Sequence, residues 1–186
     1  MDGLPSPTFL SENECMFGSP LAINLTIPNE PHPVGAIVPI RVEVRNISSG
    51  ELWIVGVLDG SEMGFRFPHY LPIAIPPKPL PPLESEGCGN VAPLRLQDFR
   101  RLAPGESFDP TVAESGAGYL PIYAFANFSP TFAGRFELRL TLSTESEKPE
   151  DWLGMLGYPG EEEVLERLKA VPRVRVESNV AVIHVS

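Results

Sequence analysis

Residues 38–59 constrain the fold of this chain more than any other stretch. The first half alternates, with apolar residues at every second position: Val38, Ile40, Val42 and Val44. A period of two is typical of a strand with one buried face and one face in solvent. After turn-forming residues at 46–50, residues 52–58 are almost wholly apolar, as in a strand buried on both faces. We therefore predict that these two strands form the central hairpin of an antiparallel β-sandwich.

Three further segments have strand patterns. Residues 21–27 alternate and predict a first strand, and residues 179–185 predict a last strand whose two faces are both apolar. Residues 134–144 alternate apolar and polar side chains in the same way as residues 38–44. We expect this third segment to lie beside the central hairpin.

A second hairpin is predicted around residues 103–106, where Pro-Gly is a strong turn signal. Pro104 and Gly105 would occupy the central positions of a type II turn, with strands in residues 94–102 and 107–112. Residues 117–128 are apolar and aromatic but have no clean period. A strand, a short helix and a packed loop all remain open for that segment.

The chain holds 22 prolines and 16 glycines, which favours many short strands joined by long loops. Residues 68–82 alone contain seven prolines. Because proline cannot donate to a strand ladder, this segment must lie at a sheet edge or cross the surface. It could act as a proline-rich ligand for an SH3-like groove, but a stiff loop laid over the sandwich is the preferred interpretation.

One helix is predicted, in residues 161–171, inside an insert between the last two strands. Its apolar stripe consists of Val164, Leu165, Leu168 and Val171. Three glutamates occupy the first turn, where the helix dipole favours negative charge. Since so short a helix is unstable alone, we expect it to dock on its own sandwich with Trp152 or Leu156 beside it.

Two short segments suggest a family. Leu102-Ala-Pro-Gly-Glu106 and Ala133-Gly-Arg-Phe-Glu-Leu138 resemble the L-x-P-G-E and P-G-x-Y-x-L segments of the bacillus intracellular proteinase inhibitor family, with Phe136 in place of Tyr. The chain is similar to that family over residues 38–60 and 99–143. The resemblance implies a bacterial immunoglobulin-like fold, whereas protease inhibition does not follow from the fold.

The predicted organisation is therefore a flexible tail at residues 1–19 and a single β-sandwich domain at residues 20–186. We expect a mainly β, immunoglobulin-like antiparallel sandwich with one short helix. Its long inserted loops would lie at about residues 64–93 and 145–177, which have no counterpart in the family's pattern.

The net charge of −10 argues against a nucleic-acid partner and against an anionic membrane surface. No stretch approaches the ~20 apolar residues that a membrane-spanning helix needs. Residues 1–20 lack a basic start followed by an apolar run, so we expect a cytoplasmic protein in which Cys15 and Cys88 are reduced thiols.

No catalytic motif is found, and we predict no catalytic residue, no cofactor and no metal. His69 and Cys88 could supply two soft metal ligands or a nucleophile pair, but no ligand spacing supports a closed site. The alternative function that we keep is a metal-dependent binder or an enzyme that uses His69, Cys88 and nearby acidic loops.

The preferred function is a non-catalytic module that binds another protein, with proteinase inhibition as a narrower version. The candidate binding residues lie in the two inserted loops: Arg66, Phe67, His69, Tyr70 and Trp152. Exposed aromatic and arginine clusters mark interfaces. For the large apolar side chains of these loops we favour the other interpretation, that they fold back and cover the open ends of the sandwich.

Overall fold

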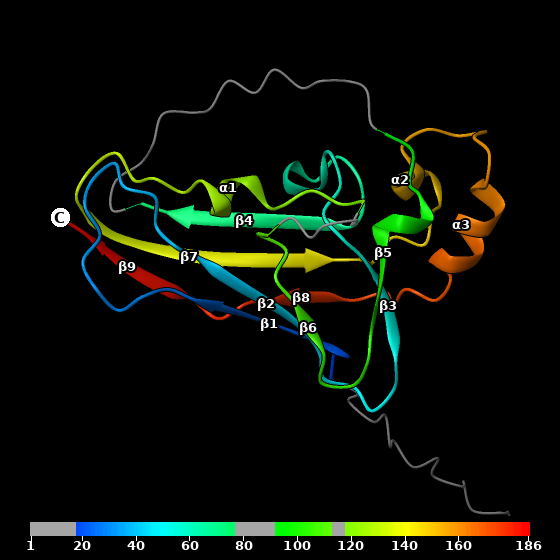
Figure 1. The fold of residues 1–186 in the computed structure, drawn as a ribbon, viewed down its shortest axis with the longest axis horizontal. Helices are drawn as coiled ribbons and strands as arrows, with labels where there is room; N and C mark the ends of the chain where they lie inside the picture. Colours follow the sequence, from blue (N-terminus) through cyan, green and yellow to red (C-terminus); the bar gives the residue numbers. More distant parts are fainter. Residues whose placement is uncertain (1–17, 77–91, 113–117) are drawn as a thin grey trace, which may run out of the picture.

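The structure of the protein is a computed structural model, which describes residues 18–76, 92–112 and 118–186. Within these ranges the fold is mainly β, and its strands form antiparallel sheets (Figure 1). The strands are β1 (Leu21–Thr26), β2 (Arg41–Asn46), β3 (Leu52–Val55), β4 (His69–Ile75), β5 (Phe99–Leu102), β6 (Ser107–Phe108), β7 (Gly134–Ser143), β8 (Arg175–Glu177) and β9 (Ala181–Val185). The helices are α1 (Tyr123–Ala126), α2 (Glu150–Leu153) and α3 (Glu161–Leu168), with single 3₁₀ turns η1 (Ser61–Met63) and η2 (Leu96–Asp98).

The first sheet has the order β1-β2-β6. Val42 and Val44 of β2 are fully buried, whereas Arg41 and Arg45 are exposed. The alternation of residues 38–44 therefore sets which face of the strand is covered, as predicted.

The chain leaves β2 at a corner built by the buried side chain of Asn46. Its amide donates to the backbone oxygens of Gly50 and Leu102 at 2.8 and 3.0 Å. Its backbone accepts from Gly105 and donates to Glu106, both at 2.9 Å. Because these bonds tie the corner to the 103–106 turn, β3 pairs with β5 rather than with β2. The predicted central hairpin is wrong.

Residues 103–106 form the predicted turn, in which the Glu106 N–H donates to the Ala103 oxygen at 3.0 Å and Gly105 has a φ of 79°. A type II turn needs positive φ at that position, which glycine adopts without steric strain. The flanking strands do not pair with each other, since β5 joins β3 and β6 joins β2. The predicted second hairpin is wrong because the chain changes sheets at this turn.

The second sheet has the order β4-β7-β8, and β9 also pairs with β7. Residues 134–143 thus lie between β4 and the last two strands rather than beside β2, contrary to our prediction. The proline-containing β4 is an edge strand, as expected, and it accommodates Pro72 there. The continuation of the proline-rich segment and most of the predicted tail lie outside the described residues.

β3 and β5 form a third, two-stranded sheet. All three sheets contribute to one apolar interior, which we call the first core. It contains buried side chains such as Val42, Leu138, Leu140 and Ile183. Asn179 joins the edges of the sheets, because its side chain accepts from the Leu25 N–H at 2.7 Å and donates to the Leu25 oxygen at 3.1 Å. That side chain imitates the backbone of a paired strand.

A second core lies under α3. It consists of Val55, Leu58, Leu94, Phe99, Trp152, Leu153, Val164, Leu168 and Val171. The predicted helix thus docks on its own chain, against β3 and β5 (Figure 1). Trp152 belongs to the same core, as expected. Leu156 is not part of this core, since 63% of its surface is exposed.

The insert that carries α2 and α3 is closed at its base by Thr144. Its N–H donates to the Val174 oxygen at 2.8 Å, and its hydroxyl donates to the Pro172 oxygen at 2.6 Å. β7 and β8 pair immediately beyond this point. The insert therefore leaves and rejoins the sheet at one place.

Residues 117–128, for which strand, helix and loop were open, contain the one-turn helix α1 and loop, with the start of the segment outside the described residues. Among the helices that the structure describes, none has the length and apolar character needed to cross a bilayer.

Candidate functional site

Three of the five predicted binding residues lie in the interior. Arg66 is 3% exposed, and Tyr70 and Trp152 are fully buried. Phe67 and His69 are half-buried. The hypothesis of an exposed surface is wrong for the first three, and the favoured interpretation, that the side chains fold back, holds for them.

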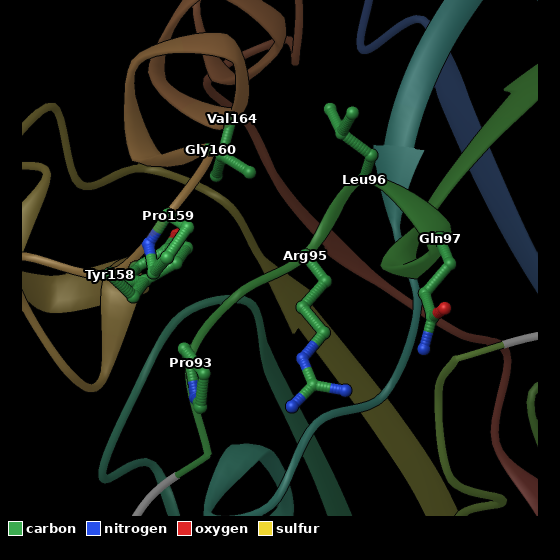
Figure 2. A pocket seen from close by; sticks show the side chains of 8 residues that line it. All are labelled: Pro93, Arg95, Leu96, Gln97, Tyr158, Pro159, Gly160 and Val164. Atoms are coloured by element: carbon green, nitrogen blue, oxygen red, sulfur yellow. The ribbon is translucent and has the colours of Figure 1, made fainter.

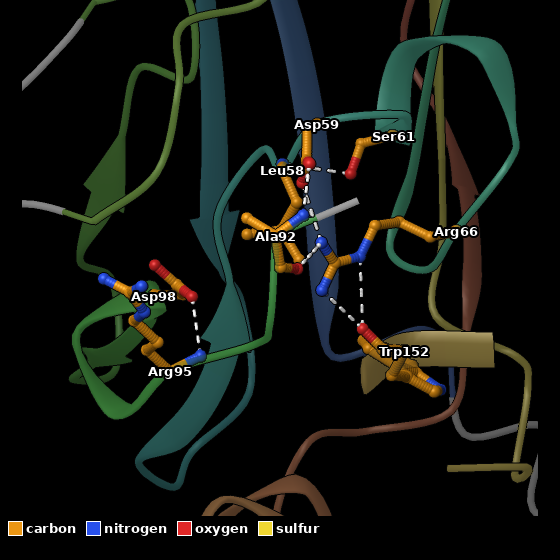
Figure 3. A network of polar contacts seen from close by, with 8 residues as sticks. All are labelled: Leu58, Asp59, Ser61, Arg66, Ala92, Arg95, Asp98 and Trp152. Carbon is orange, nitrogen blue, oxygen red and sulfur yellow. Dashed lines mark hydrogen bonds and ion pairs between the residues drawn. The ribbon is translucent and has the colours of Figure 1, made fainter. Parts of the chain in front are cut away.

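Arg66 is buried because it binds three segments of the chain together (Figure 3). Its Nη1 donates to Asp59 at 2.7 Å and to the Ala92 oxygen at 2.6 Å. Its Nε and Nη2 donate to the Trp152 oxygen at 3.1 and 2.7 Å. Burial lowers the pKa of the Arg66 guanidinium, and the Asp59 carboxylate opposes that shift. The Arg66 side chain therefore has a structural role.

Tyr70 and Trp152 also use their polar atoms internally. The Tyr70 hydroxyl donates to the Val55 oxygen at 2.8 Å, which connects β4 to β3. Burial raises the pKa of the Tyr70 phenol. The Trp152 indole N–H donates to the Ser146 oxygen at 2.8 Å. Each ring is therefore anchored at both its apolar and its polar end.

His69 stacks on Phe67, with ring centroids 3.8 Å apart, and Phe67 in turn contacts Trp152 at 5.5 Å. Burial lowers the pKa of His69, and the charge of Asp151 opposes that shift. Phe67 packs against the second core, and His69 is joined to that core through Phe67.

The alternative site of His69 and Cys88 is not assembled by the described residues. Cys88 lies outside them, and they contain no group of three or more His, Cys, Asp or Glu side chains that could hold a metal ion. The ring of His69 stacks on Phe67, whose side chain cannot bind a metal.

Two adjoining pockets lie beside η2 and share the residues Pro93, Arg95 and Gln97. One has a volume of about 470 Å³ and lies between η2 and the start of α3 (Figure 2). The other has a volume of about 250 Å³ and reaches Asp59, Arg66 and Asp98. We call them the outer pocket and the inner pocket.

The inner pocket contains a buried carboxyl group, that of Asp98, which is 4% exposed. Its Oδ2 accepts the Arg95 N–H at 2.7 Å. Burial raises the pKa of Asp98, while that hydrogen bond and the charge of Arg66 oppose the shift. Gly118 packs so closely that a Cβ there would lie 2.3 Å from Asp98 Oδ1, so only glycine fits. The carboxyl group is held in place by the fold.

Four exposed apolar side chains, which we call the loop patch, lie in two neighbouring segments, those of η1 and α1 with the residues next to them. It consists of Met63, Phe65, Leu120 and Tyr123, with exposed fractions of 55%, 63%, 52% and 69%. The Glu62 carboxylate accepts the N–H groups of Tyr123 and Ala124 at 2.9 and 3.0 Å, so η1 and α1 are held side by side (Figure 1).

Sequence reasoning missed both the pockets and the loop patch. Arg95 and Asp98 lie in a segment that we predicted as continuous strand, and the only signal was a single acid among apolar and basic residues. Phe65 and Phe67 are equivalent in the sequence pattern, yet the first is exposed and the second packs on Trp152. Tertiary contacts, not composition, separate the two.

No family model, curated protein or solved structure matches this chain.

Proposed function

We propose that the protein is a non-catalytic protein-interaction module built on an immunoglobulin-like sandwich. Two antiparallel sheets that share the first core support the sandwich. A parallel bridge between His32 and Val185, which brings the segment after β1 to the edge of the other sheet, supports an immunoglobulin-like connection. The family resemblance rests on the 102–106 turn and on the start of β7.

The loop patch is the observation that carries the proposed activity. Single exposed apolar residues are ordinary, but neighbouring ones on a surface mark interaction sites. Two of the four are aromatic, the residue class that contributes most to protein interfaces. Because Glu62 fixes α1 against η1, the patch is ordered before a partner arrives, which lowers the entropic cost of binding.

The test replaces Phe65 and Tyr123 together by Ser. The tagged double variant and the wild type are used to capture partners from native lysate, with unchanged melting as the check on folding. A matched control replaces Ile37 and Ile47, which are 62% and 57% exposed and lie elsewhere on the chain. We expect partners that survive the control and are lost with the loop variant; retention of every partner by the loop variant would refute the site.

The narrower version, proteinase inhibition, rests on the family resemblance alone. Micromolar protein is assayed against a panel of serine proteases, with Phe65→Ser/Tyr123→Ser as the paired variant. Inhibition that the variant loses supports this version. Full protease activity across the panel removes it and leaves the interaction module standing.

The competing hypothesis, a metal-dependent binder or enzyme using His69 and Cys88, has no observation among the described residues in its favour. Elemental analysis of the purified protein separates the two. A stoichiometric metal that is lost in Cys88→Ser would refute the interaction module and support the competing hypothesis.

A further inference from the structure

We propose that the outer pocket is a binding site for an organic monocarboxylate with a compact apolar body, and that Arg95 is the partner of its carboxylate. This site is separate from the loop patch. The proposal does not depend on whether a partner protein binds to the loop patch.

The walls of the outer pocket fit an apolar body. Its apolar lining comes from Pro93, Leu96, Pro159 and Val164. Its volume of about 470 Å³ lies within the range of small-molecule sites. The walls come from two elements, since Pro93 and Leu96 flank Arg95 while Pro159 and Val164 belong to the approach and first turns of α3. A ligand here would be held between η2 and α3.

Arg95 supplies the charged end. Its side chain is exposed and lies between Tyr158 and Gln97 (Figure 2). Among the described residues its guanidinium makes no hydrogen bond or close ion pair, and its charge acts on Asp98 only from a distance, whereas Arg66, Arg101 and Arg135 each hold a carboxylate. A guanidinium offers a planar fork of donors that matches the two oxygens of a carboxylate.

The acids around the pocket limit the ligand to a single negative charge. Asp98 lies behind Arg95 in the inner pocket, and Glu161, Glu162 and Glu163 line a hollow that continues from Tyr158 and Gly160. A phosphate dianion or a dicarboxylate would meet these charges. A monocarboxylate can instead place its one charge at Arg95 and its apolar part against the proline walls.

Two sources carry this chemistry, namely free organic acids and the last residue of a polypeptide. The probes distinguish them: phenylacetate represents the free acid, and N-acetylphenylalanine represents a chain end. N-acetylphenylalaninamide is the matched neutral control, because it differs from the second probe only in lacking the carboxylate. Inorganic phosphate tests the limit on charge.

The experiment is an NMR titration of the full chain with each probe. We expect at least one carboxylate probe to shift the amide signals of Leu96, Gly160 and Val164, and the amide and phosphate to leave them in place. Tighter binding of phenylacetate identifies a free acid as the ligand class, and tighter binding of N-acetylphenylalanine identifies a chain end. Binding of the neutral amide as strongly as the acid would overturn the proposal.

The matched variants are Arg95→Gln and Arg101→Gln. Arg95→Gln removes the charge but keeps a hydrogen-bonding side chain, and its backbone N–H still reaches Asp98. We expect it to weaken binding of the carboxylate probe at least tenfold. Arg101→Gln, at an exposed ion pair with Glu51, should leave binding unchanged. Equal affinities in wild type and Arg95→Gln, or no shift with either acid, would reject the site.

Discussion

The two cores of this protein are held together in different ways. The first core consists of apolar and aromatic side chains, and the one hydroxyl among them, that of Tyr70, donates to the Val55 oxygen. Its residues reach it because the strands alternate buried and exposed positions. The second core joins α2 and α3 to β3 and β5, and beside it lies the Arg66 guanidinium, whose donors hold the Asp59 carboxylate and two backbone oxygens. One core follows from strand periodicity, while the other depends on a single buried cation.

The stability of the two cores therefore depends on their side chains in two different ways. In the first core the free energy of unfolding is spread over many apolar contacts, so each side chain contributes a share set by its buried area. In the second core one side chain satisfies several polar groups at once, and its loss leaves all of them without a partner. The predictions below test that contrast, beginning with the largest expected effect.

Arg66→Met should lower the free energy of unfolding by about 3–5 kcal/mol, because Asp59 and the oxygens of Ala92 and Trp152 lose their donor. Urea denaturation followed by far-UV circular dichroism measures it. Arg101→Met is the control: its ion pair with Glu51 is exposed, so the change should stay within about 0.5 kcal/mol. Equal effects of the two substitutions would show that buried Arg66 contributes no more to stability than exposed Arg101.

Leu138→Ala and Leu168→Ala compare the cores directly, since both side chains are buried. Each should cost about 2–5 kcal/mol. We expect Leu138→Ala to accelerate amide exchange throughout both sheets, whereas Leu168→Ala should accelerate it chiefly in α3. If Leu168→Ala accelerates exchange in β7 equally, the two cores unfold as one unit. Leu156→Ala, at an exposed position of the insert, is the control.

Tyr70→Phe and Tyr158→Phe remove one hydroxyl each, and the two hydroxyls differ in their partners. That of Tyr70 donates to the Val55 oxygen at 2.8 Å, so its loss should cost about 1–3 kcal/mol. That of Tyr158 is buried with no partner among the described residues, so its removal should leave stability unchanged or raise it slightly. Thermal melts of the two variants in one buffer decide this, and equal losses would contradict it.

The pH dependence at His69 should be the smallest effect. Because burial lowers its pKa below the ordinary value of 6.5, the unfolded chain takes up a proton first as the pH falls. Stability is therefore lost as the pH drops from about 6.5 toward the lowered pKa of the folded state. His69→Gln should show a shallower decline in unfolding free energy between about pH 7.5 and 5 than wild type. Parallel declines would rule out this contribution.

Strand periodicity predicted the elements of the first core but not their pairing. Val42 and Val44 are buried where the alternation places them, and residues 134–144 form the expected strand. Both predicted hairpins were wrong because Asn46 binds the 103–106 turn. The two strands on either side of each turn therefore belong to different sheets. A side chain that contacts a turn distant in the sequence leaves no periodic signal.

For the candidate site, residue type was the wrong guide. Arg66, Tyr70 and Trp152 have the composition of an interface, yet their polar atoms bind backbone oxygens of their own chain. Arg95, by contrast, looked like one charge in a strand. Whether the fold uses an arginine side chain, as it uses Arg66, depends on the carbonyl and carboxylate oxygens around that side chain, and the sequence pattern does not contain these.

The two hydrogen bonds by which Thr144 closes the base of the insert have a consequence for how this chain can be altered. Both ends of the insert meet at that residue, and the entropy of closing a loop grows only slowly with loop length. The base is therefore a grafting point, at which a different segment could be spliced in while β7 and β8 keep their register. Any graft would have to bring its own apolar cover for Val55 and Phe99, because α3 shields them at present.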